Sequence, residues 1–236
     1  HGQHWAEGTY LGQLDFQSDT ARHFRRQVLG PFLDRFLRRT SAPDLSPVTV
    51  FDTGEHLWET FESWPPDTQL RSLYLQPDQS VAFRKPGPSA EPAGYVSDPA
   101  KPVPYAPRPN WGSSYRNPAA ISDWQQWLVE DQRFVDGRPD VLTWQGRPLT
   151  EPLTVRGPVT VRLLAETTGE DADWVVKLID VYPDEDPDSF EMSGYQLMVS
   201  GDIFRGRYRE DWENPKPLTP GEVLEYEIPL PHLNHT

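Results

Sequence analysis

The strongest constraint on the fold lies in the last third of the sequence, where apolar and polar residues alternate in successive short runs. These runs predict β-strands at residues 159–166, 174–182, 195–204 and 223–230. A turn at residues 168–171 separates the first two, and no helical periodicity intervenes between the runs. Strands at this spacing without helices favour an antiparallel sandwich of the jelly-roll or immunoglobulin type.

Proline, glycine and aromatic residues support a β-rich domain with many turns. The chain has 26 Pro and 16 Gly beside ten Phe, nine Tyr and nine Trp, whereas a disordered chain would lack the aromatic residues. Further strands are predicted at residues 48–52 and 70–75. The Pro-rich residues 85–118 fit a linker, or an ordered strap because they include Tyr95, Tyr105, Trp111 and Tyr115.

One segment near the N-terminus has the periodicity of a helix instead. From Ser18, the predicted N-cap, to Arg39, apolar residues recur at helical spacing, and a basic run from Arg35 suits a helix C-terminus. Gly30 and Pro31 fall inside this helix and predict a kink, because proline lacks a backbone donor and collides with the preceding turn.

Charge and residue usage exclude several classes of function. The net charge of −14 argues against nucleic acid or an anionic membrane surface as a partner. The sequence also has no apolar run near the ~18 residues that a membrane span needs. With no Cys in the chain, disulfides, thiolate nucleophiles and Cys-ligated metals are excluded.

The residues alone point to no complete catalytic site. His1 and His4 could hold a metal, but two ligands without a third favour polar loop residues. The acidic residues 184–188 lack the Gly and the bidentate Glu of a calcium loop and predict a solvated hairpin tip. Neither a G-x-S-x-G nucleophile elbow nor a glycine-rich phosphate loop occurs. These patterns describe a β-rich acidic domain with an attached helix.

Particular strings are more specific than the patterns. They are His1-Gly2-Gln3, residues 8–16, 19–22 and 53–55, Trp58, Trp64-Pro65, and residues 95–99 and 171–183. Together they resemble α-amino-acid ester hydrolases, which belong with the cocaine-esterase-like and X-Pro dipeptidyl-peptidase-like serine hydrolases. Residues 171–183 resemble the signature of that family's C-terminal jelly roll.

The resemblance implies a mainly β chain, in which an antiparallel jelly-roll sandwich follows the C-terminal helix and strand of an α/β-hydrolase domain. Residues 1–84 would end the catalytic domain, and residues 85–236 would form a jelly roll without its last strands. The triad order Ser, Asp, His places His1 at the triad His, which would take the Ser proton and return it to the leaving group. The alternative is that His1 is an ordinary loop residue.

The same resemblance implies that the nucleophilic Ser, the triad Asp and the oxyanion hole lie upstream of His1. We therefore expect the sequence to be an excerpt of a longer polypeptide, and expect these 236 residues to be inactive by themselves because those groups carry much of the transition-state stabilisation. The remainder of the catalytic domain would be a partner of this chain.

The expected activity is that of a serine hydrolase that cleaves and transfers the acyl group of α-amino acid esters and amides, including α-amino β-lactam antibiotics. No metal or organic cofactor is implied, a homo-oligomer is allowed, and relatives of this type suggest a secreted or periplasmic protein. Alternatives are a glutaryl acylase or an X-Pro dipeptidyl peptidase of the same family. An alternative of another class is a non-catalytic carbohydrate-binding jelly roll, which exposed aromatic side chains on a sheet face would favour.

Overall fold

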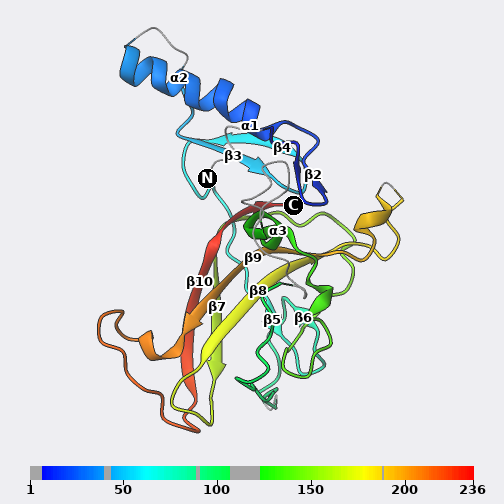
Figure 1. Ribbon diagram of the computed structural model, residues 1–236, viewed down its shortest axis with the longest axis vertical. Helices are drawn as coiled ribbons and strands as arrows, with labels where there is room; N and C mark the ends of the chain where they lie inside the picture. The colour runs from blue at the N-terminus through cyan, green and yellow to red at the C-terminus, as the bar shows by residue number, and fades with distance from the viewer. Residues whose placement is uncertain (1–6, 40–43, 89–90, 107–122, 188) are drawn as a thin grey trace.

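A computed structural model describes residues 7–39, 44–88, 91–106, 123–187 and 189–236 (Figure 1). The chain is mainly β, with few helices. Long strands form a sandwich in the lower half of the view, and a helix and a hairpin from the first third of the sequence lie above it. No helix in the part of the chain that the structure describes is long and apolar enough to cross a membrane.

Two antiparallel strand pairs make the sandwich. β7 (Val155–Ala165) pairs with β10 (Leu224–His235), and β8 (Asp173–Val181) pairs with β9 (Gln196–Arg205). Alternate residues of β10 turn inward, so that Tyr226, Ile228 and Leu230 are buried against apolar side chains of the other three strands. This arrangement confirms the predicted mainly β class and the four strand segments of the C-terminal third.

The pairing of β7 with β10 extends further than the alternation predicts. β10 continues to His235 across an irregularity between Leu230 and Leu233, and β7 begins at Val155. Neither extension was predicted, because prolines and Gly157 interrupt the alternation of apolar and polar residues there. Pro229 and Pro231 are tolerated because β10 has one hydrogen-bonded neighbour in its sheet, and a residue without a backbone donor fits such an edge.

A second apolar cluster lies beside the sandwich. Val129 of α3 (Asp123–Val129) packs with Met192, Tyr195 and Leu197, and the Tyr195 hydroxyl donates a hydrogen bond to the carbonyl oxygen of Val129. Burial raises the pKa of Tyr195 to about 12. The 3₁₀ turns η5 (Gln132–Phe134) and η6 (Phe190–Met192) lie next to this cluster in sequence. The third 3₁₀ turn, η7 (Gly206–Tyr208), follows β9 directly.

The N-terminal helix forms as predicted, with two differences. It runs through α1 (Thr20–His23), η2 (Phe24–Leu29), α2 (Gly30–Leu33) and η3 (Asp34–Arg38), and its N-cap is Asp19 rather than Ser18. Pro31, where a kink was predicted, lies in the short α-helical segment α2, and the segments on either side of it, η2 and η3, are π-helical. The Gly30 N–H donates to the carbonyl of Arg25, five residues earlier. This wider turn relieves the clash that proline causes in an α-helix.

Three short hairpins complete the described chain. β1 (Tyr10–Leu11) pairs with β2 (Leu14–Asp15), and β5 (Tyr74–Leu75) pairs with β6 (Val81–Ala82). β3 (Val48–Asp52) pairs with β4 (Leu57–Phe61) and confirms the strand predicted at residues 48–52. The strand predicted at residues 70–75 shrinks to Tyr74–Leu75, because Leu70 to Leu73 have no strand partner in the described structure.

The Pro-rich stretch behaves as an extended segment where it is described. Residues 91–106 contain neither helix nor strand, and Tyr95 and Tyr105 are exposed. Tyr95 is the more covered of the two, with 42% of its surface exposed against 67% for Tyr105. Trp111 and Tyr115 lie outside the described residues.

Candidate functional site

The predicted catalytic His1 lies outside the described residues, as does His4. The described chain begins at Glu7, and Gly8 is tied to the start of the helix. The Gly8 N–H donates to Oδ1 of Asp19 at 3.0 Å, and the Gly8 carbonyl accepts from the Thr20 hydroxyl at 2.9 Å. A Cβ at Gly8 would lie 2.6 Å from the Ala21 nitrogen, so this close contact requires glycine.

Asp19 stabilises this junction by binding two segments with one carboxylate oxygen. Its Oδ1 accepts from the Arg22 N–H at 2.9 Å as well as from Gly8. These backbone hydrogen bonds, that of Arg22 foremost, lower the pKa of Asp19, so that the carboxylate is charged at neutral pH. A negative charge at this end of the helix also suits the helix dipole.

The helix and the β3–β4 hairpin are joined by a stack of aromatic rings. His23 of α1 lies parallel to Trp58 of β4, with ring centroids 4.3 Å apart and planes 8° apart. Trp58 in turn meets the edge of Phe51 at 5.4 Å. Burial lowers the pKa of His23, so the stacked imidazole is neutral at pH 7.

A network of charged and polar side chains joins this hairpin to the end of the sandwich. Nη2 of Arg156 in β7 lies 2.6 Å and 2.7 Å from the two carboxylate oxygens of Glu59 in β4. The Arg156 Nε donates to Oδ1 of Asn234 in β10 at 2.9 Å, and Asn234 Nδ2 donates to Glu59 at 3.0 Å. Because hydrogen bonds to a carboxylate and to an amide fix the orientation of the guanidinium, this network holds the hairpin and the sandwich together. We call the polar contacts between the β3–β4 hairpin and the end of the sandwich the joint.

Asp52 is the most buried member of this joint, with 1% of its surface exposed. Its Oδ1 accepts from the backbone N–H groups of Gly54 and Glu55, and its Oδ2 accepts from the Thr236 hydroxyl at 2.9 Å. Burial by itself raises the pKa of Asp52, but these hydrogen bonds outweigh burial and the pKa lies below 3.8. The buried carboxylate is therefore charged at neutral pH and organises the hairpin turn.

His235 lies between a hydroxyl and a carboxylate. Its Nδ1 is 2.8 Å from Oγ1 of Thr53, and its Nε2 is 3.1 Å from Oδ2 of Asp180. The order hydroxyl, imidazole, carboxylate is that of a hydrolytic triad. Here, however, the ring is 7% exposed and both ring nitrogens face protein atoms, which leaves little room for an acyl group. The arrangement is best explained as part of the joint between hairpin and sandwich.

Sequence reasoning did not single out these polar residues, because their partners are far apart along the chain. Thr53 and His235 are separated by 182 positions, and Arg156 and Glu59 by 97. The available signals were the string 53–55, which is part of the family resemblance, and the polar end of the last strand, where Asn234, His235 and Thr236 follow an alternating run.

The remaining described histidines and the predicted acidic tip have surroundings of their own. His56 lies in the β3–β4 turn, and His232 accepts a hydrogen bond from Nε1 of Trp64 at 3.0 Å. Asp184 and Glu185 are exposed at the β8–β9 connection, as a solvated tip predicts, while Asp188 lies outside the described residues. Within the described ranges, no group of three or more His, Cys, Asp or Glu could hold a metal ion.

Tryptophan burial bears on the carbohydrate-binding alternative. Among the tryptophans whose side chains are described, Trp58, Trp64, Trp127, Trp144 and Trp174 are half-buried. Trp212 is different, since 73% of its surface is exposed. Most of these rings therefore contribute to packing, and one is available to a ligand.

Comparison with known proteins extends these observations. The chain is 30% identical over 210 residues to a cocaine esterase of Rhodococcus sp., covering 84% of this chain and 33% of that protein. An aminopeptidase from the marine sediment archaeon Thaumarchaeota archaeon matches in structure with 49% identity and a TM-score of 0.93, covering 100% of this chain and 38% of that one. An α-amino acid ester hydrolase matches with 46% identity and a TM-score of 0.87, covering 100% and 39%.

The chain thus spans about a third of the length of the curated relative. The relatives are ester hydrolases and peptidases, which agrees with the resemblance found in the sequence. Residues 41–236, which include the sandwich and the β3–β4 hairpin, match a model of a non-catalytic domain. The chain therefore belongs to the family of X-Pro dipeptidyl-peptidase C-terminal non-catalytic domains.

Proposed function

We propose that this chain is the C-terminal part of a serine hydrolase that cleaves and transfers the acyl group of α-amino acid esters and amides through an acyl-enzyme. The observation that carries the proposal is the similarity of the whole of this chain to 39% of an α-amino acid ester hydrolase and to 38% of an aminopeptidase. Both names refer to substrates with an amino group beside the acyl carbon. β-Lactam antibiotics with α-amino side chains belong to the same substrate class.

In this proposal His1 is the general base and the sandwich is the jelly roll that follows a hydrolase domain. His1 would remove the proton from a serine hydroxyl of the longer protein and return it to the leaving group. The ties from Gly8 to Asp19 and Thr20 support this role, because they fix the chain shortly after His1 to a rigid helix end. No metal or organic cofactor takes part in the proposed steps.

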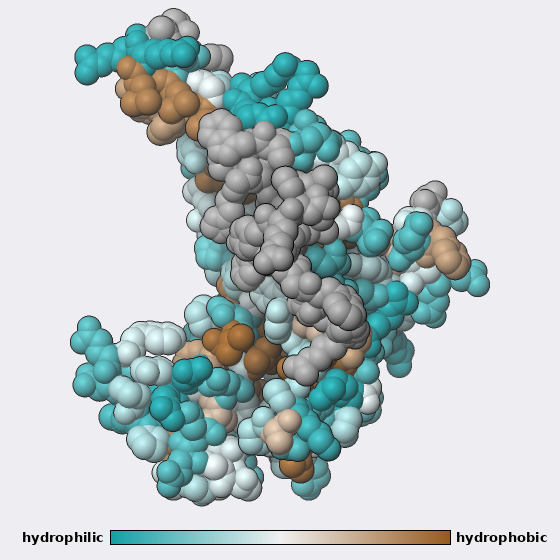
Figure 2. Space-filling model, viewed as in Figure 1, coloured by the Kyte–Doolittle hydropathy of each residue, from teal (hydrophilic) through white to brown (hydrophobic). Residues whose placement is uncertain are grey.

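The rest of the catalytic domain is the proposed partner of the N-terminal helix. One side of the helix presents Phe32, Leu33, Phe36 and Leu37 to solvent, seen as the brown underside of the helix in Figure 2. We call these four residues the helix stripe. An apolar patch of this kind marks a surface that another protein segment covers. The relatives are about two and a half times as long as this chain, which leaves enough further sequence in them for such a segment.

An aminopeptidase is the second candidate function, favoured by the 49% identity to the archaeal enzyme. It shares the proposed nucleophile chemistry and differs in the preferred leaving group, an amine rather than an alcohol. A glutaryl acylase or an X-Pro dipeptidyl peptidase is a further alternative that uses the same serine chemistry. The expected location of the protein, secreted or periplasmic, stays a prediction.

The test is hydrolysis by the longer protein that carries this sequence. We expect turnover of the methyl ester and the anilide of a free α-amino acid, and much slower turnover of their N-acetylated forms. The ratio of the ester rate to the anilide rate separates an ester hydrolase from an aminopeptidase. A preference for the N-acetylated compounds contradicts the proposed substrate class.

The role of His1 has its own test in the same protein. We expect His1→Asn to lower kcat by a factor on the order of a thousand or more, because the serine loses its base. His232→Asn is the matched control and should leave kcat unchanged. Equal kcat in the His1 variant and the parent protein excludes His1 from the triad.

A further inference from the structure

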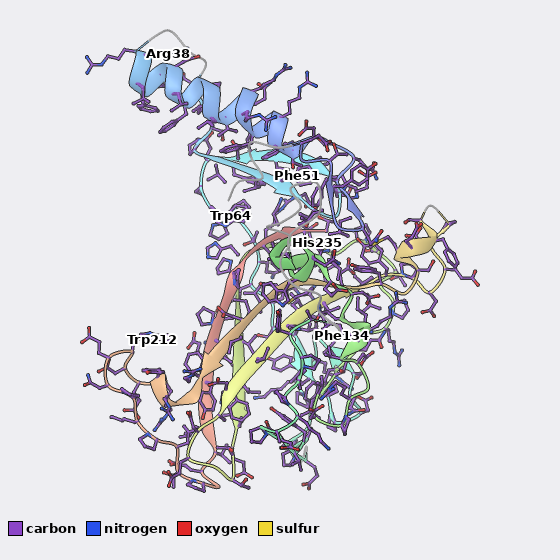
Figure 3. All side chains as sticks on the ribbon, in the orientation of Figure 1. Arg38, Phe51, Trp64, Phe134, Trp212 and His235 are labelled. Atoms are coloured by element: carbon purple, nitrogen blue, oxygen red, sulfur yellow. The ribbon has the colours of Figure 1, made fainter. Side chains whose placement is uncertain are left out.

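A cavity at the far end of the sandwich is independent of the proposed hydrolase chemistry. Its volume is about 370 Å³, within the ~300–1,000 Å³ typical of small-molecule sites. It lies between β10 and the segment that follows β9, which includes η7. Figure 3 labels Trp212 on this segment and His235 at the other end of β10.

Aromatic rings form the apolar part of the cavity. Trp212 and Tyr208 are stacked with centroids 6.1 Å apart and planes 16° apart, and Phe204 meets Trp212 edge-on at 6.1 Å. Tyr226 closes the inner side and packs against Phe204 at 6.0 Å. Trp212 is 73% exposed although it lies in this cluster, so its ring face is accessible from solvent.

Carboxylates form the polar part. Glu225 and Glu227 occupy alternate, exposed positions of β10, so their side chains lie on the same side of the strand, and both line the cavity. Arg162 is opposite Glu227 in the register, yet in the described structure no basic side chain reaches ion-pair distance of either carboxylate. Two like charges on one face of a strand repel each other.

Two basic side chains near the cavity, Arg209 and Lys216, have other partners. Nη1 of Arg209 donates to the carbonyls of Lys216, at 2.9 Å, and Gly206, and Nη2 of Arg209 pairs with Glu210 at 3.4 Å. Lys216 also forms an ion pair with Glu210. Glu210 is therefore ion-paired within the protein, whereas neither Glu225 nor Glu227 forms an ion pair in the part of the chain that the structure describes.

We propose that this cavity binds a small organic cation, whose charged group lies against the Trp212 ring and between the carboxylates of Glu225 and Glu227. An aromatic face attracts a cation through the ring quadrupole, and two carboxylates without an ion-pair partner add Coulomb attraction. A neutral saccharide would also stack on the rings, but it would leave the repulsion between the two glutamates unchanged.

The experiment titrates the longer protein with choline and with the uncharged analogue of choline in which a tert-butyl group replaces the trimethylammonium. Calorimetry and ligand-observed NMR follow binding. We expect choline to bind at least about tenfold more tightly than the analogue, and added salt to weaken choline binding. Equal affinities, tighter binding of maltose than of choline, or no binding of choline overturns the proposal.

Variants assign the binding to this cavity. Glu225→Gln with Glu227→Gln should weaken choline binding about tenfold, and Trp212→Ala should weaken it by a similar factor, while Trp212→Phe keeps most of the affinity. The double variant Glu151→Gln with Glu166→Gln changes the net charge equally at exposed positions outside the cavity and should have no effect. Unchanged affinity in the Glu225 and Glu227 variant overturns the proposal even if choline binds. Ester hydrolysis measured in parallel reports on the proposed function separately.

Discussion

At the scale of single residues, the β3–β4 turn meets the end of β10 at Gly54. A Cβ at this position would lie 1.8 Å from the Thr236 carbonyl oxygen and 2.9 Å from the Thr236 nitrogen. Both contacts are with backbone atoms, which cannot rotate away as a side chain can. The joint between hairpin and sandwich therefore depends on the absence of a side chain at Gly54.

Gly54→Ala tests this contact. We expect the substitution to lower the free energy of unfolding by about 2 kcal/mol or more, because the turn or the end of β10 must move. Urea unfolding followed by circular dichroism measures the change. Gly87→Ala is the control, since a Cβ there meets no atom within 4 Å, and it should change the stability little. A variant of Gly54 as stable as the parent protein would contradict the close approach.

Asp52 makes the stability of the folded protein depend on pH. The pKa of Asp52 in the folded protein lies below 3.8, so the folded state favours the charged form more than the unfolded state does. Its contribution to stability is complete above the unfolded pKa and is lost as the pH falls through the folded pKa.

We therefore expect Asp52→Asn to reduce the stability at pH 7 and to flatten the loss of stability below about pH 4. Chemical unfolding at a series of pH values tests this expectation. Asp67→Asn, at an exposed aspartate, should leave the profile unchanged. If the Asp52 variant lost stability in acid as steeply as the parent protein, another group would have to be responsible.

At the scale of elements, the helix stripe is the apolar surface that the proposed catalytic domain would cover. An amphipathic helix is stabilised mainly by packing of its apolar face, yet the last two turns of this helix expose Phe32, Phe36 and Leu37. The aromatic pair Phe32 and Phe36 covers itself in part, with centroids 4.8 Å apart. A covering segment from the catalytic domain would bury the remainder.

The prediction compares one substitution in two proteins. Phe36→Ser should destabilise the longer protein by about 2 kcal/mol, because a buried aromatic side chain is lost, and should change the stability of the 236-residue chain by well under 1 kcal/mol. Thermal unfolding of both proteins measures the difference. Arg26→Ser, at an exposed position of the same helix, is the control for helix propensity. Equal effects in the two proteins would show that the stripe stays exposed.

At the scale of the whole molecule, the two strand pairs share one core. Ile228 of β10 has 1% of its surface exposed and packs among side chains of β7, β8 and β9. The backbone hydrogen-bond ladders of β7–β10 and β8–β9 are separate among the described residues, so this core holds the two pairs together, aided by side-chain hydrogen bonds such as those of Ser200 with Pro231 and His235 with Asp180. Loss of the core should therefore affect both pairs at once.

Ile228→Ala is expected to lower the free energy of unfolding by about 2–5 kcal/mol, because the change leaves a cavity at the centre of the sandwich. Circular dichroism and tryptophan fluorescence should report the same shifted transition, since both pairs unfold together. Val223→Ala, at an exposed position beside β10, is the control. Separate transitions for the two signals would mean that the pairs fold independently.

The sequence by itself determined the mainly β class, the helix and the four long strands, because alternation and helical periodicity are local properties that survive in any context. Short motif strings also determined the family, which the match over residues 41–236 confirmed. The π-helical segments on either side of Pro31 and the extension of β10 past Pro231 were not predicted, since both depend on packing partners.

Only the tertiary structure decided which polar residues meet. The pairs Arg156 with Glu59 and His235 with Asp180 join segments 97 and 55 positions apart, and no local pattern encodes such distances. The same holds for the cavity, where Trp212 and Glu225 come together because the segment after β9 folds back beside β10. Residues close in sequence determine the local periodicity, whereas a site forms only when folding brings together residues that are far apart in sequence.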